Sequence, residues 1–205
     1  YMTNETGANV AFVQEGELWS YDTAANTLIK VFSFRGYEGI DNRENYGEHG
    51  VRIASVDEAG NVDYIVYGYM NRGIHEGQVG IAVYHYDRTA NTNEEQVFIP
   101  SDKSYEVMKS ELGQLMYIND RSELFLMLDG TVYGIDLSTL KVREVVRHLS
   151  GENYAVSESN ALIAWTDPKE TENGCIHVLD LSGQKTTDIT EGSGEILRPL
   201  GFMEE

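Results

Sequence analysis

The sequence predicts an all-β protein built from repeated small antiparallel sheets, and two observations carry this prediction. Four alternating runs end in an Asp and then break into small polar residues: Trp19-Ser20-Tyr21-Asp22, Tyr84-His85-Tyr86-Asp87, Tyr133-Gly134-Ile135-Asp136 and Val178-Leu179-Asp180. After each break the chain returns to an apolar run. A strand-only unit that recurs every 44 to 65 residues is typical of an array of small sheets.

The individual strands are assigned from period-two alternation and from β-branched and aromatic content. The first unit has predicted strands at 10–14, 17–22 and 28–34, and the second at 51–56, 64–69, 80–87 and 95–99. The third unit has them at 115–118, 124–128, 132–136 and 142–148, and the fourth at 154–157, 162–165, 175–181 and 186–190. Glu15-Gly16 and Asp129-Gly130 predict tight hairpin turns. Residues 104–112 predict one helix, which Ser104 can cap.

Four strands, short turns and a repeat of about 45 residues match the blade of a β-propeller. We therefore predict one β-propeller-like domain over residues 1–205, with about four four-stranded antiparallel blades. Its units lie at about 8–35, 50–100, 113–149 and 152–192, and 193–205 leads into a further strand or blade. Four blades is near the lower limit for a closed ring, and an incomplete ring would expose sheet flanks and self-associate. A β-sandwich is the alternative fold, since it also accepts many short strands.

In its Asp-terminated third strands the chain resembles TolB-type and WD-repeat-like propellers. It departs from true WD repeats, because Trp165 is followed by Thr166 and Asp167 at the end of a second strand. The segment 50–100, with its Tyr67-Gly68-Tyr69-Met70-Asn71-Arg72-Gly73 stretch, resembles part of large uncharacterised bacterial envelope proteins, including lipoproteins. That group has no established activity. The resemblance implies an exported protein that is extracellular or associated with the cell envelope.

The net charge of the chain is the strongest evidence in the sequence about which partners it can bind. With 34 acidic against 15 basic residues the net charge is −19, so the chain repels phosphate backbones and no nucleic-acid partner is expected. No stretch approaches the roughly 20 apolar residues of a membrane span, so membrane insertion is not expected. Cys175 is the sole cysteine and predicts an inert buried thiol. No cofactor and no metal site is expected from the sequence.

Two long loops of the second unit form the candidate site: residues 35–49, which enter its first strand, and 71–78, which join its second and third strands. The propeller resemblance implies that these loops share one face. They would form a ligand-binding rim from Tyr37, Asp41, Arg43, Glu44, His49, Arg72, His75 and Glu76. Histidines among carboxylates can bind a divalent metal or act as acid and base, but no pair here has a diagnostic spacing. A solvated polar loop is the alternative interpretation.

Aromatic side chains around the same loops suit sugar recognition: Tyr37, Tyr46, Tyr67 and Tyr69. For Tyr67 and Tyr69, packing between blades is the competing interpretation. The four strand-ending aspartates are interpreted as turn formers, because an Asx side chain can bond the backbone two residues on.

The sequence therefore predicts a non-catalytic binding or scaffold module of an exported bacterial protein, with a protein or a glycan as its ligand. The alternative is a polysaccharide-acting hydrolase or lyase that uses carboxylates with His49 or His75 at the rim; the separation of paired carboxylates, which such chemistry depends on, is not readable from sequence. A purely structural set of blades is the third hypothesis.

Overall fold

The computed structural model describes residues 1–33, 49–70, 73–167, 175–190 and 198–203, with residues 49 and 190 described by their backbone alone. The described residues form four four-stranded antiparallel sheets, each made of strands that are consecutive in the sequence. This arrangement confirms the all-β, propeller-like fold class. The chain divides into two compact units, Tyr1–Lys109 and Ser110–Glu205.

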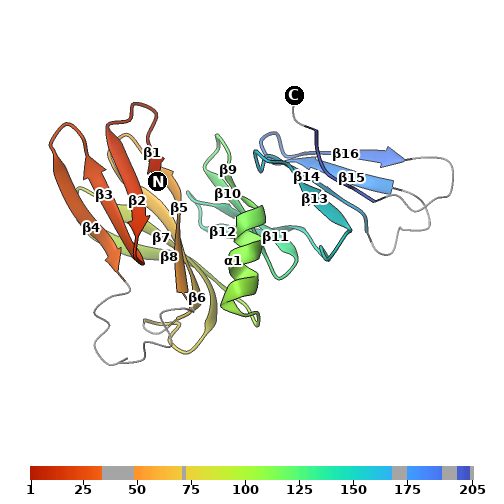
Figure 1. Ribbon diagram of the computed structural model, residues 1–205, viewed down its shortest axis with the longest axis horizontal. Helices are drawn as coiled ribbons and strands as arrows, with labels where there is room; N and C mark the ends of the chain where they lie inside the picture. The colour runs from red at the N-terminus through yellow and green to blue at the C-terminus, as the bar shows by residue number, and fades with distance from the viewer. Residues whose placement is uncertain (34–48, 71–72, 168–174, 191–197, 204–205) are drawn as a thin grey trace. The chain divides into compact units, whose positions relative to one another are not determined.

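The first unit contains two sheets that pack face to face (Figure 1). The strands of its first sheet are β1 (Met2–Thr3), β2 (Asn9–Gln14), β3 (Glu17–Asp22) and β4 (Thr27–Ser33). Those of its second sheet are β5 (His49–Val56), β6 (Val62–Tyr69), β7 (Val79–Asp87) and β8 (Thr92–Pro100). The core between them consists of Ala11, Leu18, Val31, Ile53, Val62, Tyr64, Val66, Met70, Ala82 and Tyr86.

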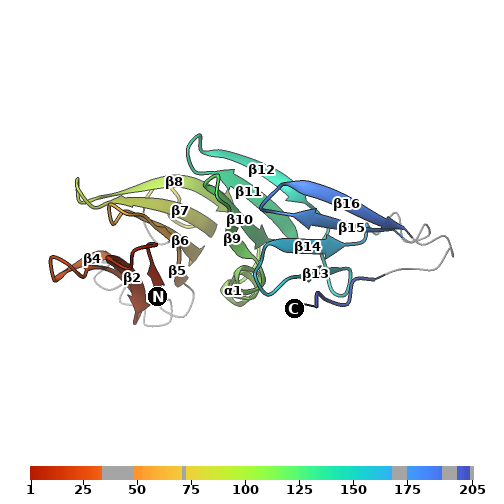
Figure 2. The ribbon, with the colours of Figure 1, turned by 90° about the horizontal axis from the view of Figure 1, so that it is seen from above.

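The second unit repeats this plan, as the view from above shows (Figure 2). Its sheets consist of β9 (Met116–Ile118), β10 (Glu123–Leu128), β11 (Thr131–Asp136) and β12 (Lys141–Val146), and of β13 (Tyr154–Val156), β14 (Leu162–Trp165), β15 (Cys175–Asp180) and β16 (Lys185–Thr190). The core between them consists of Leu115, Phe125, Met127, Val132, Val146, Leu149, Ile163, Leu179 and Leu181. The helix α1 (Tyr105–Gln114) spans the boundary between the units in the sequence.

Two-residue turns join the second and third strands of the first and third sheets, as their residues predict. Glu15 and Gly16 both have positive φ (53° and 76°), and so do Asp129 and Gly130 (55° and 69°). Positive φ at both central residues is the type I′ turn, whose twist matches that of a hairpin. At Gly130 the turn also requires a residue without a side chain, since a Cβ there would lie 2.3 Å from the Leu149 carbonyl oxygen.

One turn recurs in all four sheets and closes each third strand. The third strand ends at an Asp that pairs with the first residue of the fourth strand: Asp22 with Thr27, Asp87 with Thr92, Asp136 with Lys141 and Asp180 with Lys185. In each turn the carboxylate accepts hydrogen bonds from backbone amides two or three residues on, as Asp136 does from Ser138 and Thr139 at 2.9 Å each. We call these four residues the closing aspartates. Their predicted role as turn formers is confirmed.

A buried tyrosine ties the two sheets of the first unit together. Tyr64 is fully buried on β6, and its hydroxyl donates to Asn93 Oδ1 at 3.0 Å. Asn93 in turn donates to the Val31 carbonyl of β4 at 2.7 Å. The Tyr64 ring also stacks on Tyr84, with the ring centroids 5.4 Å apart. This chain of contacts fixes the spacing of the sheets that carry the predicted rim.

Several details differ from the sequence prediction, among them the start of β8, which lies at Thr92 and not at residue 95. The first sheet gains β1, a two-residue strand that pairs Met2 with Ala11. The strand β5 begins at His49, two residues before the predicted start, because its pairing with β6 continues to Gly68. Cys175 is half-buried at the start of β15, not fully buried.

Candidate functional site

The backbone register places the start of β5 at His49 and the described part of the second predicted loop, residues 73–78, at one end of the second sheet. His49 pairs with Gly68, Gly68 with Gly80, and Gly80 with Pro100, so this row crosses all four strands. The chain enters β5 and passes from β6 to β7 at this end. That the two loops share one face, as the resemblance implied, stays a prediction, because most of the loop 35–49 lies outside the described residues.

Within this rim, His75 is held in place by two contacts. Its ring stacks on Phe98, with the centroids 3.8 Å apart and the planes 12° from parallel. Its Nε2 lies 2.9 Å from Glu95 Oε1, and Glu95 also accepts a hydrogen bond from the Tyr84 hydroxyl at 3.0 Å. The residue before it, Ile74, is 85% exposed. The loop thus presents an aliphatic side chain beside a fixed histidine, and Glu76 is exposed next to them.

The other predicted rim residues are not tested by the structure. Tyr37, Asp41, Arg43, Glu44 and Arg72 lie outside the described residues, and His49 is described by its backbone alone. Their part in a ligand site stays a prediction.

Tyr67 is a packed ring, and the ring it stacks on is Tyr105 of the helix α1. It is buried, stacks on Tyr105 with the centroids 5.5 Å apart, and lies so close to Gly50 that a Cβ there would approach its ring to 2.1 Å. Burial raises the pKa of the Tyr67 hydroxyl well above its ordinary value, and the neighbouring Tyr105 adds to the effect. The ring is buried, so it offers no platform for a sugar.

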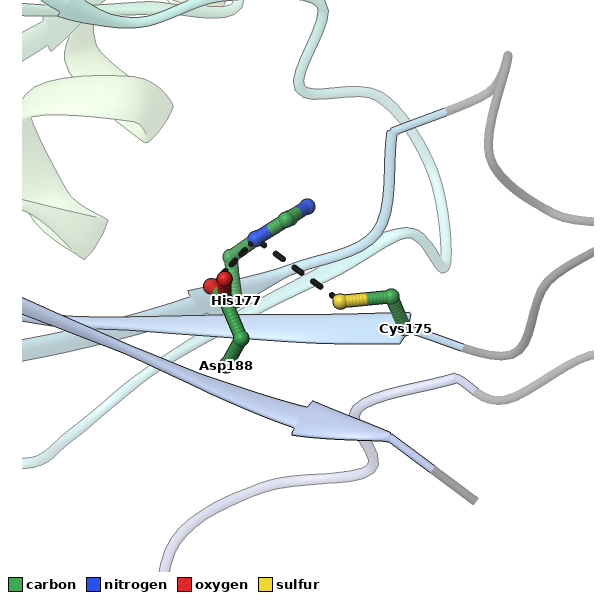
Figure 3. Close-up of side chains that lie close together, drawn as sticks. All are labelled: Cys175, His177 and Asp188. Atoms are coloured by element: carbon green, nitrogen blue, oxygen red, sulfur yellow. Dashed lines mark hydrogen bonds and ion pairs between the residues drawn. The ribbon is translucent and has the colours of Figure 1, made fainter. Parts of the chain in front are cut away.

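A second cluster of chemical interest lies in the fourth sheet. Cys175 and His177 stand two residues apart on β15 and therefore on one face, and Asp188 is the direct partner of His177 on β16. Figure 3 shows the three side chains directed toward one another. One ligand atom of each lies within 4.8 Å of the others. The sequence pattern did not predict that Cys175 and His177 form a cluster with Asp188.

The contacts within this cluster all converge on one nitrogen. His177 Nδ1 lies 2.7 Å from Asp188 Oδ1 and 3.9 Å from Cys175 Sγ, while the second ring nitrogen points away from both (Figure 3). A nucleophile–base–orienter relay needs the thiol and the carboxylate on opposite ring nitrogens. The cluster lacks that geometry, and its three donors instead surround a common point.

The pairing of β15 with β16 is what brings these donors together. In the other three sheets the third and fourth strands pair regularly from the closing aspartate back to Trp19, Tyr84 or Tyr133, and a β-bulge then shifts the register. The shifts fall between Leu18 and Trp19, between Val83 and Tyr84, and between Val132 and Tyr133. β15 and β16 pair without a shift from Asp180 back to Cys175. Cys175, His177 and Asp188 share one face because Cys175 is two residues from His177 on β15 and Asp188 is the direct partner of His177.

The same position in each sheet pairs an aromatic ring with a charged residue. The four pairs are Trp19 with Lys30, Tyr84 with Glu95, Tyr133 with Glu144 and His177 with Asp188. In the fourth sheet the ring is an imidazole, and Trp165 on β14 flanks it with the centroids 5.2 Å apart. The fourth repeat thus places a ligand-bearing ring where the others place Trp or Tyr.

A polar groove of about 610 Å³ lies in the second unit and is lined by Arg121, Glu123, Asp136, Lys141, Val142, Arg143 and Gln184. Its floor is an ion pair, in which Arg143 Nη2 and Nε lie 2.7 and 2.8 Å from Glu123 Oε1. Gln184, in the turn before β16, donates to the other oxygen of the Glu123 carboxylate. These contacts join the third and fourth sheets, which gives the groove a structural explanation.

The four meander sheets define the class of the chain: an all-β protein of propeller-like blades. No family model and no curated protein sequence matches it. Among the residues that the structure describes, no helix combines the length and the apolar character needed to cross a bilayer.

Solved structures with a similar fold include several bacterial proteins. Porphyromonas gingivalis dipeptidyl peptidase 4 is 10% identical, with a TM-score of 0.44 over 93% of this chain and 32% of that chain. The extracellular domain of a B. thetaiotaomicron protein described as a hybrid two-component system is 14% identical, with a TM-score of 0.46 over 98% of this chain and 23% of that chain. TolB from Acinetobacter baumannii is 15% identical, with a TM-score of 0.28 over 95% of this chain and 54% of that chain. The chain spans about a quarter to a half of these proteins, and the likeness concerns the fold alone.

Proposed function

We propose that the chain is a non-catalytic binding module of an exported bacterial protein, and that it binds a protein ligand at the rim of the second sheet. The observation that carries the proposal is the loop before β7, where the exposed Ile74 stands beside a His75 that Phe98 and Glu95 hold in place. An aliphatic side chain presented on a fixed loop suits an apolar pocket on a partner protein. The net charge of −19 favours a partner with basic surface.

Two further observations bear on the choice of function, one on catalysis and one on the kind of ligand. The closing aspartates use their carboxylates to accept backbone hydrogen bonds in turns, so they do not form a repeated set of catalytic acids. A glycan ligand has less support, because the Tyr67 ring is buried and stacked on Tyr105.

The proposal is tested by selecting binders from a random-peptide display library on the immobilised protein. Enriched peptides are then measured against the wild type, Ile74→Ser and a control, Leu28→Ser, which changes an aliphatic side chain of similar kind on β4. Binding that weakens about tenfold or more for Ile74→Ser, a loss of roughly 1.4 kcal/mol, supports the rim. Equal binding to Ile74→Ser and the wild type contradicts it. Release of new reducing ends from a polysaccharide panel would instead favour the hydrolase or lyase.

A further inference from the structure

We propose that Cys175, His177 and Asp188 bind a divalent transition-metal ion, and that Zn²⁺ is the ion their donor set suits best. This site lies in the fourth sheet and is independent of the proposed rim. It concerns residues from β15 and β16 alone.

The spacing of the three donors is close to what one ion requires. Zinc bonds of about 2.0–2.3 Å in a tetrahedral arrangement separate neighbouring ligand atoms by roughly 3.3–3.8 Å. Here Cys175 Sγ lies 3.9 Å and Asp188 Oδ1 2.7 Å from His177 Nδ1, and all three atoms lie within 4.8 Å of one another. Small rotations of the exposed Asp188 and of Cys175 would equalise these separations. The ion would then occupy the point at which the side chains already converge (Figure 3).

The donor types select among ions. Thiolate sulfur and imidazole nitrogen are ligands for Zn²⁺ and related transition metals, whereas Ca²⁺ and Mg²⁺ need a shell of oxygens. A thiolate and a carboxylate together carry the two negative charges that neutralise a divalent cation. A strongly acidic chain further raises the local concentration of cations.

The scaffold holds the donors in place without a ligand. All three residues lie on paired strands, and the register of β15 with β16 runs unbroken from Asp180 to Cys175. The Trp165 ring packs beside His177, whose side chain is only 19% exposed. Asp188 is 58% exposed, which leaves the site open to an incoming ion. Three protein ligands leave a fourth position for water or an external group.

The test uses tag-free protein, because a histidine tag binds zinc, and Zn²⁺ alone as the titrant in calorimetry. The expected result is one Zn²⁺ per chain, with affinity reduced at least about tenfold in Cys175→Ser and in His177→Ala. Titration with Co²⁺ provides a readout specific to sulfur: the wild type should develop a thiolate-to-cobalt charge-transfer band in the near ultraviolet, and Cys175→Ser should not.

His85→Ala is the matched control. His85 Nδ1 lies 2.8 Å from Asp63 Oδ1 on the neighbouring strand, a pair like His177–Asp188, but Val83 occupies the position two residues before it. This variant should bind Zn²⁺ like the wild type. Circular dichroism establishes that each variant keeps its sheets.

A measurement on the wild type alone keeps the proposal falsifiable if a variant misfolds. Saturating Zn²⁺ should slow alkylation of Cys175 by iodoacetamide at least about tenfold, because a metal-bound thiolate is a poor nucleophile. An unchanged alkylation rate would overturn the site. So would a Cys175→Ser variant that binds Zn²⁺ as tightly as the wild type, or a wild type without the cobalt band.

Discussion

Arg88 Nη2 lies 2.9 Å from Asp22 Oδ2, so the residue that follows one closing aspartate reaches the closing aspartate of the preceding sheet. The same guanidinium donates from Nη1 to Asn9 Oδ1 at 2.7 Å, and Asn9 is buried on β2. Hydrogen bonds from the Ala25 and Ala24 amides and the charge of Arg88 lower the pKa of Asp22 against the effect of its desolvation. The turn at the end of β7 is thereby tied to the first sheet.

Replacing Arg88 with Ala should destabilise the first unit. The change leaves the buried Asn9 oxygen without the Arg88 donor, which costs about 1–3 kcal/mol for an unsatisfied buried group. Urea unfolding monitored by circular dichroism measures the loss. The control is Arg147→Ala, whose side chain is mostly exposed and pairs with Glu144, and which should change stability by about 0.5 kcal/mol or less. Equal effects of the two substitutions would contradict this role of Arg88.

Asp136→Asn should change how stability responds to acid. Hydrogen bonds from the Ser138 hydroxyl and from Thr139 lower the pKa of Asp136 to about 2, against about 3.9 in an unfolded chain. A depressed folded-state pKa contributes stability that is present above the unfolded value and is lost as the pH falls through the folded value. The wild type should therefore exceed Asp136→Asn in stability at pH 5, and the difference should shrink between about pH 4 and pH 2.

Urea unfolding at a series of pH values measures this difference. Asp102→Asn, a change of the same charge at an exposed position outside the turns, serves as the control. A stability gap between the wild type and Asp136→Asn that stays constant down to pH 2 would speak against the turn carboxylate as its source.

Two glycines of the second unit separate backbone strain from steric overlap. Gly130 and Gly151 both have positive φ (69° and 56°), but only at Gly130 does an added Cβ meet another atom, the Leu149 carbonyl oxygen at 2.3 Å. Gly151→Ala should cost about 1 kcal/mol, the strain of a left-handed L-residue. Gly130→Ala should cost about 2–4 kcal/mol, because an overpacking penalty of about 1–3 kcal/mol is added. Thermal and urea unfolding compare the two, and a larger effect at Gly151 would refute the steric explanation.

The Tyr64 hydroxyl should contribute measurably to the packing of the first two sheets. Tyr64→Phe removes the donor to Asn93, whose amide holds the Val31 carbonyl, and should cost about 0.5–1.5 kcal/mol. Tyr21→Phe removes a similar hydroxyl contact to Asn26 at an exposed site and should cost about 0.5 kcal/mol or less. Urea unfolding measures the free energy of unfolding of both variants. A larger loss for Tyr64→Phe than for Tyr21→Phe would show that burial makes the Tyr64 hydrogen bond more stabilising.

Much of the fold was predictable from sequence because its local signals agree with its tertiary contacts. Alternation located strands, and Asp129-Gly130 located a hairpin that the φ angles confirm. The closing aspartates were predictable because their hydrogen bonds reach only two or three residues along the chain. β1 was missed, since two residues carry no periodicity and the strand exists only through its pairing with β2.

The Cys175–His177–Asp188 cluster was missed for a different reason. His177 and Asp188 are eleven positions apart, and their meeting depends on the register of β15 with β16. That register follows from the four-residue turn after Asp180, which pairs Asp180 with Lys185. Counting back from this pair places His177 opposite Asp188, but the sequence alone does not show that Asp180 pairs with Lys185. The bulges of the other three sheets lie one step beyond the corresponding pair, so that pair keeps the same register in every sheet.

Three residues before each closing aspartate, a third-strand residue faces a residue of the fourth strand. The side chains of this pair differ between the sheets, while the backbone pairing is the same. Turn hydrogen bonds and core packing set the backbone there, so the identity of the two facing side chains is left free. Lys30 lies over the Trp19 ring in the first sheet, the Tyr84 hydroxyl bonds Glu95 in the second, and an imidazole meets a carboxylate in the fourth. One backbone can thus carry a cation–π contact, a hydroxyl–carboxylate hydrogen bond or a set of metal donors, and a new chemistry needs only substitutions at facing positions.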